Sequence, residues 1–209
     1  ELLWEVYQEP RLKSGSALKE LNSASDALIL QYYEQPDTLK AAFGHNISRK
    51  DWEKIAHVKD TYQDVLFTAP IVAANVAHPL IQYMYDELRS PARKFTFLVG
   101  HDSNLSSVAT ALGVEEYELP NAIEKKTPIG SKIVIEKFLG ADGKEYADIN
   151  IVYQSVDQLR NMELLDLNNT PIIYPLTLKG LQKNTDGLYL MSDVNARFEQ
   201  ALRDYENIK

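Results

Sequence analysis

The stretch KFTFLVGHDSNLSSVATALGV, Lys94 to Val114, constrains the fold more than any other part of this sequence. Its first half contains the short apolar run Phe95 to Val99, which predicts a parallel strand buried on both faces of a sheet. Its second half places apolar residues, such as Leu105 and Val108, at helical spacing. Only Gly100 to Asn104 separates the two halves. The stretch therefore predicts a strand–turn–helix unit and, with it, an α/β fold.

Further strands are predicted after this unit. Lys132 to Leu139 and Tyr146 to Gln154 are two apolar runs joined by a turn around Gly143, which predicts an antiparallel hairpin. Pro171 to Leu178 reads as another extended segment, and its prolines suit the edge of a sheet. Because an α/β sheet needs several strands, this sheet is incomplete, and we expect the missing strands before Glu1.

Helices are predicted for most of the first part of the chain and for its end. Their start signals are Ser23 with Asp26, Ser48 with Asp51, Pro70, and Ser192 or Asp193. The helix after Ser48 should bury the face formed by Trp52, Ile55, Val58, Tyr62 and Val65. We therefore expect a mostly helical cap domain at about residues 1–90 and the C-terminal part of an α/β domain at about 91–209.

Composition excludes several classes of function. A net charge of −8 without any run of Lys or Arg argues against nucleic-acid partners and anionic membrane surfaces, so an anionic substrate needs a local positive site. No stretch has the roughly 18–20 apolar residues of a membrane span. The absence of cysteine excludes disulfides and thiolate catalysis. The four histidines lack metal-ligand spacing and no nucleotide-binding glycine motif occurs, so neither a metal nor a cofactor is expected.

The residues Gly100 to Asn104 leave two interpretations open. Asp, Ser and Asn are preferred helix N-caps, so the turn can be a helix start with an incidental histidine. Alternatively, a phosphate binds there, because glycine lets the backbone pass close to a ligand and a helix start offers free amide donors. A protonated His101 could then donate to a phosphate oxygen, and a protonated Asp102 could give its proton to a leaving oxygen.

The sequence resembles the histidine acid phosphatases, a branch of the histidine phosphatase superfamily that includes bacterial phytases and glucose-1-phosphatases. The segments that carry the resemblance are FLVGHDSNLSSVATALGV (97–114), LQYYE (30–34), YQDVLFTAPIVAANVAHPLI (62–81), TPIGSKIVIEKF (127–138), VYQSVDQLRN (152–161) and DGLYLM (186–191). They cover nearly the whole chain in order and are closest to the bacterial glucose-1-phosphatases. The resemblance implies a partial α/β sandwich of the histidine-phosphatase type with a helical cap domain.

The resemblance also implies roles for the histidine–aspartate pair. In this family a histidine in an R-H-G-x-R-x-P motif attacks phosphorus and forms a phosphohistidine, while arginines and the later histidine hold the phosphate. Carried over, His101 is the phosphate-contacting residue and Asp102 the general acid. No R-H-G occurs in these 209 residues, so we expect the nucleophile on a missing N-terminal half of the same protein. The chain alone is then expected to be inactive.

Substrate and location follow from the same resemblance. It implies hydrolysis of a small phosphate ester, glucose-1-phosphate or a similar sugar phosphate, by an exported, periplasmic enzyme. Glu9 is a candidate substrate-binding residue, although it can equally be an exposed glutamate at a helix end. A phytase-like inositol-phosphate phosphatase and a non-catalytic sugar-phosphate-binding protein are the alternatives.

Overall fold

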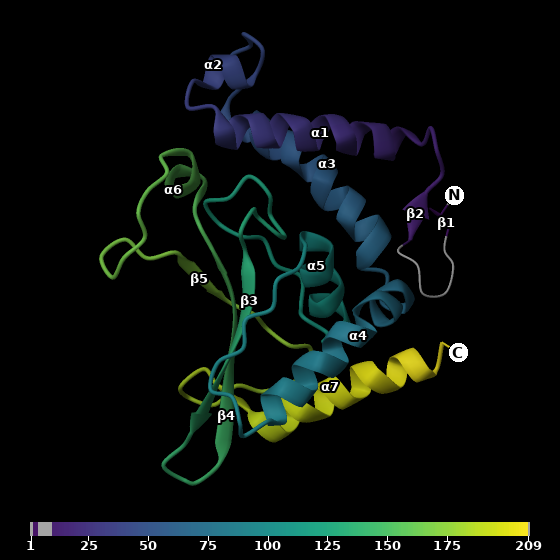
Figure 1. Cartoon of the computed structure of the whole chain (residues 1–209), viewed down its shortest axis with the longest axis vertical. Coiled ribbons are helices and arrows are strands. Elements are labelled where there is room, and N and C mark those ends of the chain that lie inside the picture. The colour runs from purple at the N-terminus through teal and green to yellow at the C-terminus, as the bar shows by residue number, and fades with distance from the viewer. Residues whose placement is uncertain (1, 4–9, 209) are drawn as a thin grey trace.

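The computed structural model describes residues 2–3 and 10–208. Its helices are α1 (Ala17–Glu34), α2 (Thr38–Ala41), α3 (Arg49–Phe67), α4 (Pro70–Arg89), α5 (Asp102–Ala111), α6 (Val156–Arg160) and α7 (Met191–Glu206) (Figure 1). Its strands are β1 (Leu2–Leu3), β2 (Arg11–Leu12), β3 (Lys132–Leu139), β4 (Glu145–Tyr153), β5 (Ile172–Pro175) and β6 (Tyr189–Leu190). Helices thus dominate the first ninety residues and a mixed α/β arrangement follows, as the fold class predicted.

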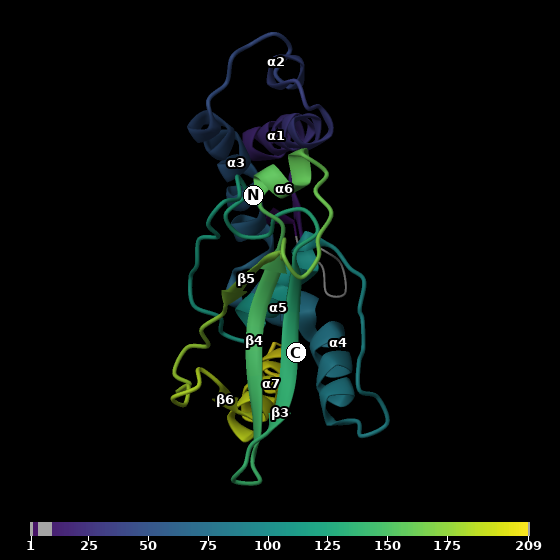
Figure 2. The same ribbon diagram turned by 90° about the vertical axis from the view of Figure 1, so that its left-hand side faces the viewer.

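The main sheet is antiparallel among the described residues. Its strand order is β3-β4-β5, and β6 pairs with the other end of β4. The long hairpin of β3 and β4 was predicted and is confirmed (Figure 2). Gly143 lies in its turn with φ of 77°, a backbone angle that favours glycine. Among the described strands β5 pairs only with β4, so the prediction of an edge strand is also confirmed.

The strand predicted at Phe95–Val99 is wrong for this structure. The segment runs extended between α4 and α5 without forming a strand (Figure 2), and every residue from Pro91 to Gly100 is exposed. Phe95 is 82% exposed and Val99 is 88% exposed. A strand needs a neighbour for its backbone hydrogen bonds, and no strand within the described residues pairs with this segment. The apolar pattern alone does not supply that neighbour.

The helix starts follow capping side chains. The Ser16 hydroxyl accepts from the backbone N–H of Lys19 at 3.4 Å, so α1 begins before the predicted signal at Ser23. The Ser23 hydroxyl instead donates to the Lys19 carbonyl inside the helix, at 3.2 Å. Ser48 was predicted to start α3, and its hydroxyl accepts from the N–H of Asp51 at 3.2 Å. α4 begins at Pro70 as predicted, and α7 begins within two residues of its predicted start.

Two apolar clusters hold the described part of the chain together. The smaller cluster joins α1, α2, α3 and α6 through Ile29, Tyr32, Ala41, Ala42, Trp52, Ala56, Ile123 and Val156. In the larger cluster, α5 and α7 cover one face of the sheet and α4 packs against both helices (Figure 1). Alternate residues of β4 point into it, namely Ala147, Ile149, Ile151 and Tyr153. The domain boundary near residue 90 stays a prediction.

The buried face of α3 differs from the predicted one. Trp52 is buried as expected, but Val65 is 42% exposed, and the polar residues Asp60 and Gln63 are buried in its place. Asp60 accepts from the backbone N–H of Lys125 at 3.0 Å. The Gln63 side-chain carbonyl accepts from Thr127 at 2.7 Å and from Ser106 of α5 at 3.3 Å. The face is otherwise apolar, and these two polar side chains are accommodated because a loop and a helix supply their hydrogen-bond partners.

Among residues 2–3 and 10–208, no single helix has the length and apolar character needed to cross a membrane. The bent pair α3 and α4, with 83° between the two helices, passes that test only when taken together, by length and composition.

Candidate active site

The start of α5 places His101 and Asp102 where a helix presents its free amide groups. His101 is the N-cap residue, and its backbone N–H donates to the Asn104 side-chain carbonyl at 2.8 Å. A Cβ on Gly100 would lie 2.8 Å from that same oxygen, so the glycine leaves room for the cap. The turn is therefore a capped helix start, which was one of the two interpretations of this segment.

The two side chains differ in how they are held. Asp102 is the first residue of α5, and its Oδ1 accepts from the backbone N–H of Ser103 at 2.8 Å. The Asp102 side chain is 39% exposed, and the residue His101 is exposed. Both side chains thus remain open to a ligand from solvent. A helix start of this kind favours an anion, because its N–H groups and dipole carry partial positive charge.

The second oxygen of Asp102 faces a lysine from another helix. Lys59 of α3 brings its Nζ to 3.3 Å from Asp102 Oδ2. The same Nζ lies 3.2 Å from Glu124 Oε1 and 3.9 Å from Asp26 Oδ1. Only 12% of the Lys59 side chain is exposed. One largely buried ammonium group therefore joins three carboxylates that come from α1, α5 and the loop before β3.

The most deeply buried member of this charge cluster is Glu124, whose side chain is 1% exposed. Its Oε2 accepts from the Tyr33 hydroxyl of α1 at 2.6 Å. Burial raises the pKa of Glu124 above its ordinary value, although Lys59 and the Tyr33 hydroxyl oppose that shift. Burial also raises the pKa of Tyr33, and Glu124 adds to the effect, so Tyr33 stays a hydrogen-bond donor.

Lys59 keeps its charge in this environment. Burial by itself would lower the pKa of Lys59, but the carboxylates of Glu124, Asp102 and Asp26 outweigh it and raise the pKa. A lysine with this balance is a fixed positive charge beside Asp102. The charge cluster of Lys59, Asp26, Asp102 and Glu124 therefore combines one permanent cation with three titratable acids.

Sequence reasoning found the histidine–aspartate pair but missed the rest of the charge cluster. Lys59 and Glu124 lie 65 positions apart and belong to no motif. A weak signal exists in the sequence: Lys59 and Asp60 are consecutive charged residues in a helix that was expected to bury an apolar face. Glu9, the candidate substrate-binding residue, lies outside the described residues. Within the part of the chain that the structure describes, no group of His, Asp or Glu side chains could hold a metal ion.

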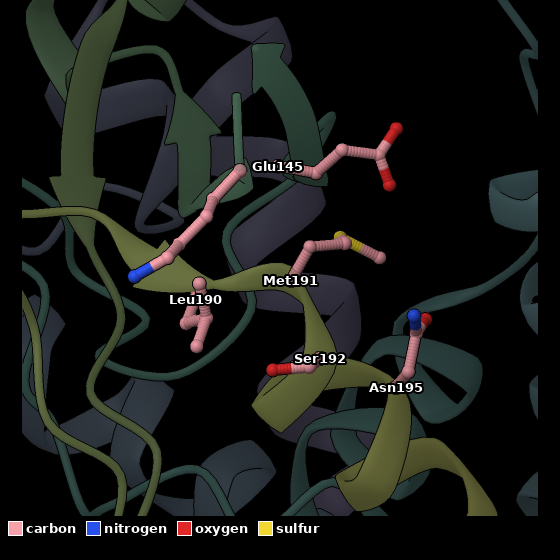
Figure 3. A pocket seen from close by; sticks show the side chains of 6 residues that line it. Glu145, Leu190, Met191, Ser192 and Asn195 are labelled. Carbon is pink, nitrogen blue, oxygen red and sulfur yellow. The ribbon is translucent and has the colours of Figure 1, made fainter. Parts of the chain in front are cut away.

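A separate hollow lies at the far end of the sheet. It has a volume of about 330 Å³ and is lined by Lys144, Glu145, Leu190, Met191, Ser192 and Asn195 (Figure 3). These residues belong to the β3–β4 turn, the start of β4, the end of β6 and the start of α7. Neither His101 nor Asp102 lines it. The start of α5 thus remains the better candidate for chemistry.

Comparison by sequence relates this chain to known phosphatases. No family model matches the chain. The chain is 41% identical over 184 residues to the glucose-1-phosphatase of Salmonella typhimurium, a match that covers 86% of this chain and 44% of that protein. It is 36% identical over 203 residues to the glucose-1-phosphatase of Providencia rettgeri, covering 95% of this chain and 48% of the other. The chain thus spans about half the length of these curated relatives.

Comparison by structure finds the same fold in bacterial phytases. The phytase of Citrobacter braakii superposes with a TM-score of 0.85 at 21% identity, over 98% of this chain and 54% of the phytase. The phytase of Klebsiella sp. ASR1 superposes with a TM-score of 0.79 at 19% identity, over 98% and 52%. At this identity the match shows the fold. Together with the sequence relatives, this fold fits the histidine acid phosphatase family, with bacterial glucose-1-phosphatases among the relatives of the chain.

Proposed function

We propose that this chain is the C-terminal part of an acid phosphatase that hydrolyses phosphomonoesters, with glucose-1-phosphate or a similar sugar phosphate as substrate. The observation that carries the proposal is Asp102. It lies at the amide end of α5, next to His101, in a chain that is 41% identical to a glucose-1-phosphatase over most of its length. A half-exposed acid beside an anion-favouring helix start suits protonation of a leaving group on a bound phosphate.

The proposed reaction has two steps. A histidine outside this chain attacks phosphorus, the N–P bond forms, the P–O bond to the sugar breaks, and Asp102 gives its proton to the departing oxygen. Water then attacks the phosphohistidine and gives a proton to the Asp102 carboxylate, the N–P bond breaks, and inorganic phosphate leaves. His101 donates to a phosphate oxygen throughout. The products are the free sugar and phosphate.

The nucleophile is assigned to a part of the protein outside the chain. No R-H-G occurs in the sequence, and the curated relatives are about twice as long as the matched region. The exposed apolar segment Phe95–Val99 supports this proposal, because it leads directly into the histidine–aspartate pair and has no strand partner among the described residues. The periplasmic location is likewise a proposal, and it rests on the family resemblance.

The test of the acid role uses the full gene product, meaning the whole polypeptide that the source gene encodes. Asp102→Asn cannot donate a proton, so kcat for glucose-1-phosphate should fall by about 10²–10⁴-fold. The fall should be much smaller for p-nitrophenyl phosphate, whose leaving group needs little protonation. Asp37→Asn is the matched control, since Asp37 caps the remote helix α2 and asparagine caps equally well. Equal slowing of both substrates by Asp102→Asn would remove it from the acid role.

A phytase-like activity is the second candidate. The structural neighbours are phytases, and phytase AppA of Escherichia coli is 26% identical over 159 residues. The net charge of −8 weakly disfavours a substrate with dense negative charge. A ratio of kcat/KM for phytate to that for glucose-1-phosphate above one would favour the phytase. A full gene product that binds sugar phosphates without turnover would instead indicate a binding protein.

A further inference from the structure

Lys59 is the unexplained part of the charge cluster. Asp102 is the proposed general acid, yet the nearest cation among the described residues lies only 3.3 Å from its carboxylate. Lys59 is also held tightly, because its Nζ contacts buried Glu124 at 3.2 Å and its stem is largely covered. A lysine that served only solubility would extend into solvent. The geometry therefore calls for a role connected to Asp102.

The contacts fix the Asp102 carboxyl from two sides. Ser103 donates its backbone N–H to Oδ1 at 2.8 Å, and Lys59 faces Oδ2 at 3.3 Å. Lys59 is in turn anchored by Glu124, which the Tyr33 hydroxyl holds at 2.6 Å. The chain of contacts runs from α1 through the loop before β3 and α3 to the start of α5. Asp102 is thus oriented by residues that no ligand needs to touch.

We propose that Lys59 is a positioning residue of the reaction: anchored by Glu124, it orients the Asp102 carboxyl and limits the range of pH over which Asp102 carries the proton that it donates. This inference rests on the proposed function, because it requires Asp102 to be the general acid. Lys59 itself need not touch the substrate.

The groups that face this carboxyl decide the sign of the effect. Lys59 of α3 contacts the carboxyl itself, and Asp26 of α1 and Glu124 of the loop before β3 contact Lys59. Tyr33 of α1 and Asp60 of α3 act on Glu124, and His101 is the neighbour of Asp102 in the chain. Removing the lysine removes a positive charge, which favours the protonated acid. Removing the Glu124 charge does the opposite, because it leaves the ammonium of Lys59 less compensated. The two changes should therefore move the pH profile in opposite directions.

The experiment measures kcat/KM of the full gene product against pH, with glucose-1-phosphate and with p-nitrophenyl phosphate. On the alkaline limb of the profile, kcat/KM falls as pH rises. In Lys59→Met this limb should move to higher pH by about one unit, because one close charge at a half-exposed site has about that strength. In Glu124→Gln the same limb should move down. Lys59→Arg keeps the charge and should keep the limb in place.

Positioning gives a second readout. Lys59→Met should lower kcat for glucose-1-phosphate by about tenfold or more and leave KM within about twofold, since a misplaced acid slows proton transfer without weakening binding. For p-nitrophenyl phosphate the loss should be small. Lys54→Met is the matched control, because Lys54 lies on the same helix with a 68% exposed side chain paired to Asp51, and it should change neither readout.

The outcomes separate the two proposals. If Asp102→Asn is selective for the poor leaving group but the limb stays in place in both Lys59→Met and Glu124→Gln, the role of Lys59 is wrong and the proposed function stands. Movement of the limb in the same direction in both variants also contradicts the role. If Lys59→Met does not fold, the direction seen in Glu124→Gln decides. A full gene product without phosphatase activity overturns both proposals.

Discussion

The two halves of Lys94–Val114 behave differently although their sequence patterns are equally clear. Residues 102–111 form α5, whereas Phe95–Val99 forms no strand and lies exposed. A helix makes its backbone hydrogen bonds within its own segment, and a strand makes them with a neighbour. The helix half can therefore form within the described chain. The strand half finds no neighbour among the described residues.

The same difference divides the candidate site. His101 and Asp102 are in place because a local cap and the charge cluster around Lys59 hold the start of α5. The proposed nucleophile has no counterpart in the sequence, just as Phe95–Val99 has no partner among the described strands. Under the proposed function, one further part of the protein would account for both gaps.

The largest expected effect tests the strand half. If Phe97 is buried by strands from outside the chain, Phe97→Ala should lower the free energy of unfolding of the full gene product by about 3–5 kcal/mol, measured by urea denaturation. In the structure described here Phe97 is 61% exposed, which by itself predicts almost no loss. The matched control is Phe43→Ala, because Phe43 is 76% exposed on the helical part and should cost less than about 0.5 kcal/mol.

Equal, small losses in Phe97→Ala and Phe43→Ala would contradict this prediction. They would mean that the strand half stays uncovered in the full gene product and that its apolar pattern has another cause.

A smaller effect tests α3, the helix that packs against α5 within the described chain. Burial raises the pKa of Asp60 from 3.8 to about 6, although its hydrogen bond from Lys125 opposes the shift. A folded pKa above the unfolded one means that the folded state holds the proton more tightly, so stability is lost as pH rises from about 4 through 6. The side chain of Asp60→Asn cannot ionise, so this variant should not show the loss of unfolding free energy, on the order of 1–3 kcal/mol, that the wild type shows as pH rises.

The measurement is the difference in unfolding free energy between wild type and Asp60→Asn at pH 4 and at pH 7. Glu20→Gln, at an exposed position of α1, is the control and should keep the loss of stability between pH 4 and pH 7. A difference that is the same at both pH values would show that Asp60 carries no such burial cost.

The sequence predicted the elements that local signals determine. The β3–β4 hairpin, the edge strand β5, the cap of α3 by Ser48 and the helix after His101 are all confirmed. The start of α1 was misjudged because Ser16 and Ser23 carry similar capping signals and only one can lie at the end of the helix. Such choices depend on where the whole helix packs.

The missed features depend on tertiary contacts. The buried face of α3 carries Asp60 and Gln63, because the segment 125–127 and α5 supply their hydrogen-bond partners. Lys59 reaches Asp102 only because α3 and α5 pack against each other. A single sequence does not show which residues these side chains contact in the fold. Polar residues of α3 are therefore predicted to be exposed, and the charge cluster is not predicted.

Amide hydrogen exchange of the full gene product tests the central claim most directly, namely that strands from outside the chain complete the site that α5 begins. The account predicts that the amides of Phe95–Val99 exchange as slowly as those in the middle of α5, since both would be hydrogen-bonded and buried. Fast exchange at 95–99, as expected of an exposed loop, together with slow exchange in α5 would contradict it.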